Sequence, residues 1–153
     1  MSKSKYARIV ILSIIFIISS LCANAQTHAY FKKYKALSHK LSSKYGIPAS
    51  LILAIGFVES GGGTSKNSKV LKNYFGIAGK NNIGSRYKKF KTVEESFEAF
   101  CRLNSKKGYY KKLKNNKNHS EWLKAMAPTY TEHPSEWIRR VNLIIKKYKL
   151  SDL

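Results

Sequence analysis

The sequence predicts a mostly helical α+β domain with one small β-hairpin lobe, and two observations carry this prediction. Apolar residues recur at helical spacing along most of the chain after residue 29. The pattern changes in NYFGIAGKNNIGSRYKKFK, residues 73–91, where glycines and paired asparagines separate short aromatic and β-branched pieces. Such a composition favours a hairpin or irregular strands, and if the domain carries chemistry, we expect its groove beside this lobe.

The first half of the chain predicts two helices. Residues 30–45 have lysines between apolar positions, which indicates an amphipathic helix that ends at Gly46. PASLILAIGFVES, residues 48–60, is apolar nearly all round, so it predicts a buried central helix with Pro48 in its first turn. Gly61 is expected to end that helix.

The second half predicts further helices. Thr92 caps one that runs to about residue 105, and Glu95 completes a capping box. A short helix is expected over residues 109–113, and the last helix begins near Ser135 with its apolar residues on one side.

Between these lies a helix predicted over residues 121–127. Ser120 is its expected cap, and Pro128 is expected to stop it.

The first 25 residues have the layout of a secretory signal. A basic start and an apolar core precede an Ala-x-Ala pattern at Ala23 and Ala25. We therefore expect export, to the periplasm or beyond the cell, and a single domain over residues 26–153. An uncleaved anchor is the alternative, but the apolar core is shorter than the roughly 18 to 20 residues of a spanning helix.

The chain is strongly basic. Removing Lys3, Lys5 and Arg8 with the signal lowers the formal net charge from +21 to +18. Such a chain attracts polyanions, namely nucleic acid, anionic lipid head groups or an acidic wall polymer. Export favours the last two, so we expect no specific nucleic-acid partner and no membrane span after cleavage. We expect a monomer.

Cysteine and histidine usage predicts no disulfide and no cofactor. Cys101 is the one cysteine after the signal, and it lies on an apolar stripe, so we interpret it as part of the core. The four histidines show no ligand spacing, so we predict no structural or catalytic metal.

Glu59 is the first candidate for chemistry. No other carboxylate precedes residue 94, and Glu59 ends an apolar helix just before three glycines. Burial and the negative end of the helix dipole both raise a carboxyl pKa, which would keep a proton available for general-acid work. Pairing with a lysine at the helix end is the alternative. Gly62 and Gly63 exceed what helix termination needs, and they would let a polymer pass close to the acid.

Four ordered motifs then resemble glycoside hydrolase family 73, the peptidoglycan-cleaving N-acetylglucosaminidases of the lysozyme-like superfamily. They are VESGGGTS at 58–65, NYFGIAGK at 73–80, YKKFKTVEESFEAF at 87–100 and APTYTEHPSEW at 127–137. The resemblance covers roughly residues 31–148. It implies a lysozyme-like fold and hydrolysis of the bond that follows N-acetylglucosamine in wall glycan.

The same resemblance implies roles for individual residues. Glu59 matches the catalytic acid, and Tyr130 matches a tyrosine placed beside the cleaved sugar. Asn73, Phe75 and Gly76 match a segment that shapes the groove wall.

The sequence also departs from the family. Gly62 stands where members usually carry a tryptophan, so a sugar-stacking platform is either missing or supplied by Tyr74 or Tyr87. In the late motif, Thr129 replaces the usual glycine and His133 the usual aspartate.

A second catalytic carboxylate is not evident. Glu94 and Glu98 could face the groove or pair with lysines, and pairing is the better expectation for each. The substrate's own N-acetyl group could instead act as the nucleophile. Rival functions are a muramidase or lytic transglycosylase of the same superfamily, and a non-catalytic basic module that binds wall polymer or another polyanion.

Overall fold

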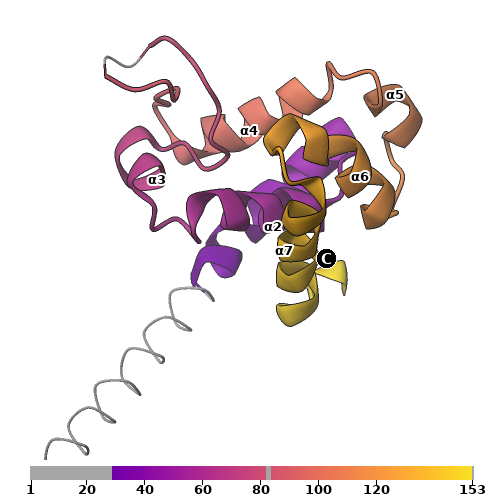
Figure 1. Ribbon diagram of the computed structural model, residues 1–153. Helices are drawn as coiled ribbons and strands as arrows, with labels where there is room; N and C mark the ends of the chain where they lie inside the picture. Colours follow the sequence, from indigo (N-terminus) through magenta and orange to yellow (C-terminus); the bar gives the residue numbers. More distant parts are fainter. Residues whose placement is uncertain (1–28, 82–83, 153) are drawn as a thin grey trace, which may run out of the picture. The chain divides into compact units, whose positions relative to one another are not determined.

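The computed structural model describes residues 29–81 and 84–152, and it is mostly helical (Figure 1). The chain divides into two compact units, residues 1–33 and 34–153, and helices α2 to α7 belong to the second unit. The predicted signal, residues 1–25, lies outside the described residues. Among the described residues, no helix has both the length and the apolar character needed to cross a bilayer.

Helix α2, Ala49–Ser60, forms the centre of the core, as predicted. The side chains of Leu51, Ile52 and Ile55 are fully buried. Gly61 ends the helix with a left-handed φ of 58°, and its N–H donates to the Phe57 carbonyl. Helix α7, Pro134–Lys147, crosses α2 and packs against it (Figure 1). The last residues of α2 are therefore held between the core and a second helix.

Helix α4, Val93–Asn104, confirms the predicted capping box with one change. Thr92 Oγ1 accepts from the Glu95 N–H at 3.1 Å, and Glu95 Oε2 accepts from the N–H of Lys91 at 2.9 Å. The Glu95 carboxylate thus accepts from the residue before the N-cap and not from the N-cap itself. Buried Cys101 lies on this helix as core, and burial raises the pKa of its thiol.

Helix α6, His119–Tyr130, is longer at both ends than the sequence predicts. Asn118, not Ser120, is the cap, and its side chain accepts from the N–H groups of Ser120 and Glu121. Pro128 lies inside the helix and does not stop it. Proline lacks the N–H for one helix bond and crowds the carbonyl four residues earlier, but only two residues of α6 follow it, and the N–H of Thr131 still donates to the Ala127 carbonyl. Tyr130 therefore lies on α6.

Three shorter elements complete the unit. The sequence did not predict α3, Lys66–Leu71, whose cap Ser65 accepts from the Ser68 N–H. The predicted short helix is present as α5, Tyr110–Leu113, and a 3-10 turn, Leu150–Asp152, follows α7.

The predicted hairpin lobe is not shown. In its described part, residues 73–81 and 84–91, the pairing is one isolated antiparallel bridge between Ala78 and Tyr87. The Lys88 N–H donates to the Ile77 carbonyl at 2.8 Å beside this bridge.

Asparagine side chains take the place of a regular strand ladder in this lobe. Asn73 is buried, and its amide donates to the carbonyls of Ile77 and Lys88, both at 2.8 Å. Exposed Asn81 donates to the Lys89 carbonyl and accepts from the Lys89 N–H. Side-chain amides can replace backbone pairing in this way, which the hydrophobic pattern does not reveal.

We expect Asn73→Ala to lower the free energy of unfolding by about 2–3 kcal/mol, because it removes a buried side chain that donates to two part-buried carbonyls and accepts from the N–H groups of Phe75 and Ile77. Asn81→Ala is the control at an exposed site: it removes two side-chain hydrogen bonds with Lys89, and we expect a loss below about 1 kcal/mol. Urea denaturation of both variants measures the difference. Equal losses would show that burial of Asn73 is not what holds the lobe.

Candidate active site

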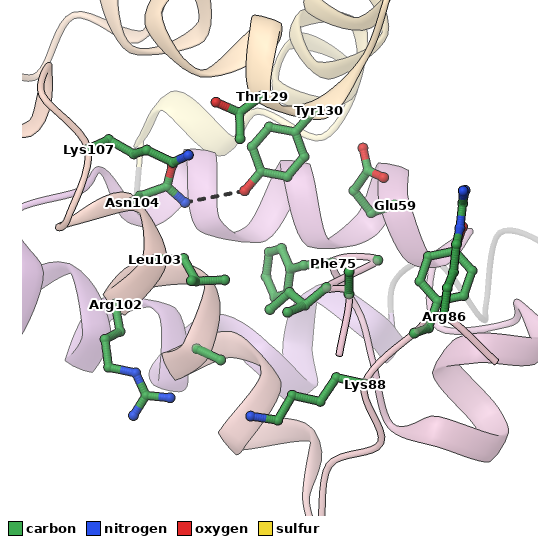
Figure 2. Close-up of a pocket in the computed structure, with 15 residues that line it drawn as sticks. Glu59, Phe75, Arg86, Lys88, Arg102, Leu103, Asn104, Lys107, Thr129 and Tyr130 are labelled. Carbon is green, nitrogen blue, oxygen red and sulfur yellow. Dashed lines mark hydrogen bonds between the residues drawn. The ribbon is translucent and has the colours of Figure 1, made fainter. Parts of the chain in front are cut away.

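A cavity of about 640 Å³ opens beside the C-terminal end of α2. Its walls come from the lobe residues 75–78 and 86–88, from the second half of α4 and from the end of α6 (Figure 2). Segments far apart in the sequence thus converge around Glu59, which lies in the last turn of α2.

Glu59 is half-buried, and its two carboxyl oxygens have different surroundings. Oε1 accepts a hydrogen bond of 2.7 Å from the indole Nε1 of Trp137 on α7. Oε2 lies toward Gly76, where an added Cβ would be 4.0 Å from it. Burial raises the pKa of Glu59, while the Trp137 hydrogen bond and the charge of Arg140 oppose that rise. Of the two causes that the sequence suggested, burial and the helix dipole, burial is the one that raises the pKa of Glu59 here.

Tyr130 links this carboxyl to α4. Its ring stacks on Trp137 with centroids 5.2 Å apart and planes inclined by 9°. Asn104 Nδ2 donates to the Tyr130 hydroxyl at 3.2 Å, and Asn104 Oδ1 accepts from Tyr109 at 2.5 Å (Figure 2). Burial raises the pKa of Tyr130, so its hydroxyl keeps its proton throughout the neutral range.

The opposite wall is aromatic. Phe75 stacks on Phe100 with centroids 4.3 Å apart, which fixes the base of the cavity. Gly76 has a φ of 63°, and a side chain there would approach both Tyr87 and the Glu59 carboxyl. The absence of a side chain at Gly76 therefore keeps the space in front of the acid open.

Half of the ten predicted site residues line this cavity, and Glu94 and Glu98 are among the five that do not. Glu59, Tyr130, Phe75, Gly76 and Tyr87 line it, whereas Gly62, Asn73 and Tyr74 are outside its walls.

The structure corrects the expectation that Tyr74 could supply a sugar platform. Tyr74 is buried and accepts a hydrogen bond from the hydroxyl of Tyr34. An added Cβ on Gly63 would lie 2.8 Å from the Tyr74 hydroxyl, so this ring fills the space beneath the glycine turn. Gly62 has a φ of 66°, and a Cβ there would meet Phe57 at 2.8 Å. A tryptophan at that position would need a different local backbone.

Neither candidate for a second carboxylate reaches the cavity. Glu98 bonds to Lys44 at 2.5 Å and to the Tyr45 hydroxyl at 3.1 Å, and these bonds lower its pKa. Glu94 is exposed and does not line the cavity either. Among the described residues, Glu59 is the one carboxylate in the cavity wall.

Trp137 and Asn104 are site residues that the sequence analysis missed. Trp137 belongs to the apolar stripe of the last helix, so the sequence suggested a core residue and gave no sign that it donates to Glu59. The signal available was that a buried indole N–H needs an acceptor. His133, which replaces the family's aspartate, caps α7 without a side-chain hydrogen bond. In residues 29–81 and 84–152, no cluster of histidine, cysteine or acidic side chains could hold a metal ion.

Comparison with known proteins agrees with this geometry. The family model for glucosaminidase, described as mannosyl-glycoprotein endo-beta-N-acetylglucosaminidase, matches residues 25–150. The chain belongs to this family. It is thus a glycoside hydrolase of family 73 and a cell-wall glucosaminidase. A search of curated proteins finds no match.

Solved structures share the fold at low sequence identity. The catalytic domain of the autolysin Auto from Listeria monocytogenes has a TM-score of 0.69 and 19% identity over 83% of this chain and 86% of that one. The glycoside hydrolase domain of FlgJ from Salmonella typhimurium has a TM-score of 0.64 and 18% identity, covering 80% and 88%. A type VI secretion effector–immunity complex from Pseudomonas protegens gives a TM-score of 0.58 at 18% identity, covering 83% and 99%.

We expect Trp137→Phe to raise the pKa of Glu59 further, because it removes a donor that favours the ionised carboxyl while keeping the aromatic ring. A carbon-13 NMR titration of the labelled carboxyl measures the change. Trp122→Phe is the matched control, since the Trp122 indole donates to the Asn116 carbonyl at 2.9 Å and not to Glu59. An unchanged pKa in Trp137→Phe would mean that this hydrogen bond has no effect on the acid.

Proposed function

We propose that the protein cleaves the β-1,4 bond between N-acetylglucosamine and N-acetylmuramic acid in wall glycan, with Glu59 as the general acid. The observation that carries the proposal is a half-buried carboxyl of raised pKa facing an open cavity. A general acid must hold its proton near the working pH, and burial shifts the pKa of Glu59 in that direction.

The proton for the leaving group comes from Glu59. Trp137 holds Oε1, so Oε2 is the oxygen directed toward Gly76 and the substrate. Proton transfer from Oε2 to the glycosidic oxygen lets the leaving sugar depart as a neutral alcohol while positive charge develops at the anomeric carbon. Water then adds to that carbon, and the ionised Glu59 takes up the proton that the water releases.

The substrate's N-acetyl group is the best-supported nucleophile. Glu59 is alone among carboxylates in the described cavity wall, which leaves no carboxylate partner at the short separation that a covalent intermediate needs. The acetamido oxygen can instead attack the anomeric carbon, forming a cyclic intermediate that water opens. Such a mechanism retains the anomeric configuration.

Tyr130 is suited to assist this step. Its hydroxyl oxygen already accepts from Asn104, so its own proton remains available for a substrate oxygen. Burial keeps the phenol neutral, and its stacking on Trp137 fixes the ring. We assign Tyr130 to orienting and polarising the acetamido group, and Phe75, Gly76 and Tyr87 to shaping the sugar sites.

We further propose that residues 1–25 direct export and that residues 26–153 act as a monomer on the glycan strands. The basic surface supports retention at an anionic wall. The enzyme needs no metal or other cofactor in this scheme, because proton transfer and the substrate's own acetamido group supply the chemistry.

We expect Glu59→Gln to abolish release of soluble muropeptides from purified peptidoglycan, since the amide keeps the acceptor for Trp137 but has no acidic proton. Glu94→Gln, an exposed acid outside the cavity, should retain the parent's rate. Reducing ends are identified by borohydride reduction and mass spectrometry. New N-acetylglucosamine ends support the proposal, whereas muramic or anhydro-muramic ends would replace it with a muramidase or transglycosylase.

Glu59→Gln should also stabilise the fold at neutral pH. Because folding raises the pKa of Glu59, ionisation of its carboxyl destabilises the folded state. This destabilisation is absent below the pKa of the unfolded state and complete above the pKa of the folded state. Denaturation at pH 4 and pH 8 checks this: the variant should gain relative to the parent only at the higher pH. A loss of stability at pH 8 would favour a structural role for the carboxylate.

We expect Tyr130→Phe to lower kcat by about 100-fold, the usual effect of removing one donor to a reacting group. Tyr109→Phe is its control, because it removes the hydroxyl on the other side of Asn104 and leaves the Tyr130 hydroxyl in place. Both are measured as steady-state kinetics on solubilised glycan. Equal losses in the two variants would assign the effect to Asn104 and not to a contact of Tyr130 with substrate.

A further inference from the structure

We propose that the catalytic cavity binds carboxylates carried by substituents of the glycan, through cationic side chains in its walls. The inference rests on the proposed function and adds to it a preference for anionic over neutral strands. Its basis is the charge of the cavity lining, which contains Arg86, Lys88, Arg102 and Lys107 beside the single carboxyl of Glu59.

The cations occupy both ends of the cavity (Figure 2). Arg86 lies near Glu59, whereas Arg102 and Lys107 lie on the other side of Phe75. Lys88 extends from the lobe toward the side of Arg102. A sugar chain bound in front of Glu59 therefore has positive charge beyond it in both directions.

Two of these cations are oriented by aromatic rings. The Arg86 guanidinium lies 5.2 Å from the centroid of the Tyr87 ring and donates to the Tyr87 hydroxyl at 3.2 Å. The Lys88 ammonium lies 5.1 Å from the centroid of the Phe90 ring. Such contacts fix a charge in place without neutralising it.

Among the described residues, no carboxylate forms an ion pair with this set, although Glu98 interacts with Arg102 over a longer distance along α4. In the described part of the chain, the ion pairs are Lys44 with Glu98 and Arg139 with Glu136, neither of which involves a cavity cation. Glu59 adds no negative charge while it is protonated. The cavity thus brings like charges together, an arrangement that an anionic ligand would stabilise.

The glycan backbone cannot be that anion. A β-1,4-linked chain of N-acetylated hexosamines is neutral, so its hydroxyl and acetamido groups need no fixed cations. In wall glycan, carboxylates occur on the substituents of the muramic acid units, either within the peptide stems or on the lactyl ether when a stem has been removed. Both sources offer the same group, and Arg102 can bind it in bidentate form.

The test compares three preparations of one purified, teichoic-acid-free wall glycan. The first keeps its peptide stems, the second is stripped by an amidase so that lactyl carboxylates remain, and the third keeps its stems with all carboxylates amidated by carbodiimide and glycinamide. We expect kcat/KM to be roughly two- to fivefold higher per exposed cation–carboxylate pair on a charged preparation than on the neutralised one. The stripped preparation shows whether the lactyl group suffices or the stem is needed.

The decisive variant is Arg102→Gln with Lys107→Gln, which removes two exposed cations from the cavity. Its control is Lys111→Gln with Lys112→Gln, an equal change of charge on the exposed face of α5, outside the cavity. The preference for charged glycan, taken as the ratio of kcat/KM values, should fall toward one in the first variant and persist in the second. This control separates the cavity from general attraction to a chain with 29 basic and 8 acidic residues.

Equal kcat/KM on all three preparations would overturn the inference and leave the glucosaminidase proposal intact. The inference also fails if the control loses the preference as fully as the cavity variant. Absence of release from every preparation would refute the proposed function instead. Co-sedimentation of the same two pairs of substitutions in a Glu59→Gln background would then decide the inference, because binding of charged over neutralised glycan should drop only with the cavity pair.

Discussion

The site depends on the burial of one carboxyl group at the end of an apolar helix. Glu59 leaves α2 from a fully buried surface, and burial raises its pKa. A single directed donor, Trp137 Nε1, limits that rise and fixes which oxygen faces the cavity. Trp137 also stacks on Tyr130. The packing of α7 and α6 against α2 therefore determines how Glu59 and Tyr130 lie relative to each other. The catalytic geometry is therefore a property of how three helices pack.

An excess of basic over acidic residues works against a raised pKa at Glu59. Every cation near Glu59 favours its ionised form, as Arg140 does, so burial must outweigh the charge of the surroundings. The last turn of α2 contains no basic residue, which keeps the most direct source of positive charge away. Three of the other acids have local tasks: Glu95 accepts a hydrogen bond at the start of α4, Glu98 pairs with Lys44 and Glu136 pairs with Arg139.

The features that the sequence predicted correctly are those that depend on neighbouring residues along the chain. The buried helix, its end at Gly61 and the acid before it follow from composition, and the capping box follows from residue spacing. Pro128 was misread because the rule that proline stops helices considers the N–H it removes and not the bonds that remain. Tyr74 was misread because exposure of an aromatic side chain is decided by tertiary packing. The role of Trp137 depends on a contact across 78 positions, which no local pattern contains.

The cavity combines two kinds of electrostatics that respond to different conditions. Desolvation raises the pKa of Glu59, and dissolved salt barely changes that effect. Exposed cations such as Arg102 act through solvent and are screened over about 8 Å at physiological ionic strength. Ionic strength should therefore act on substrate capture, and pH on the chemical step. Because Arg102 and Lys107 lie on the far side of Phe75 from Glu59 (Figure 2), they can attract an anionic polymer with little effect on the proton of the acid.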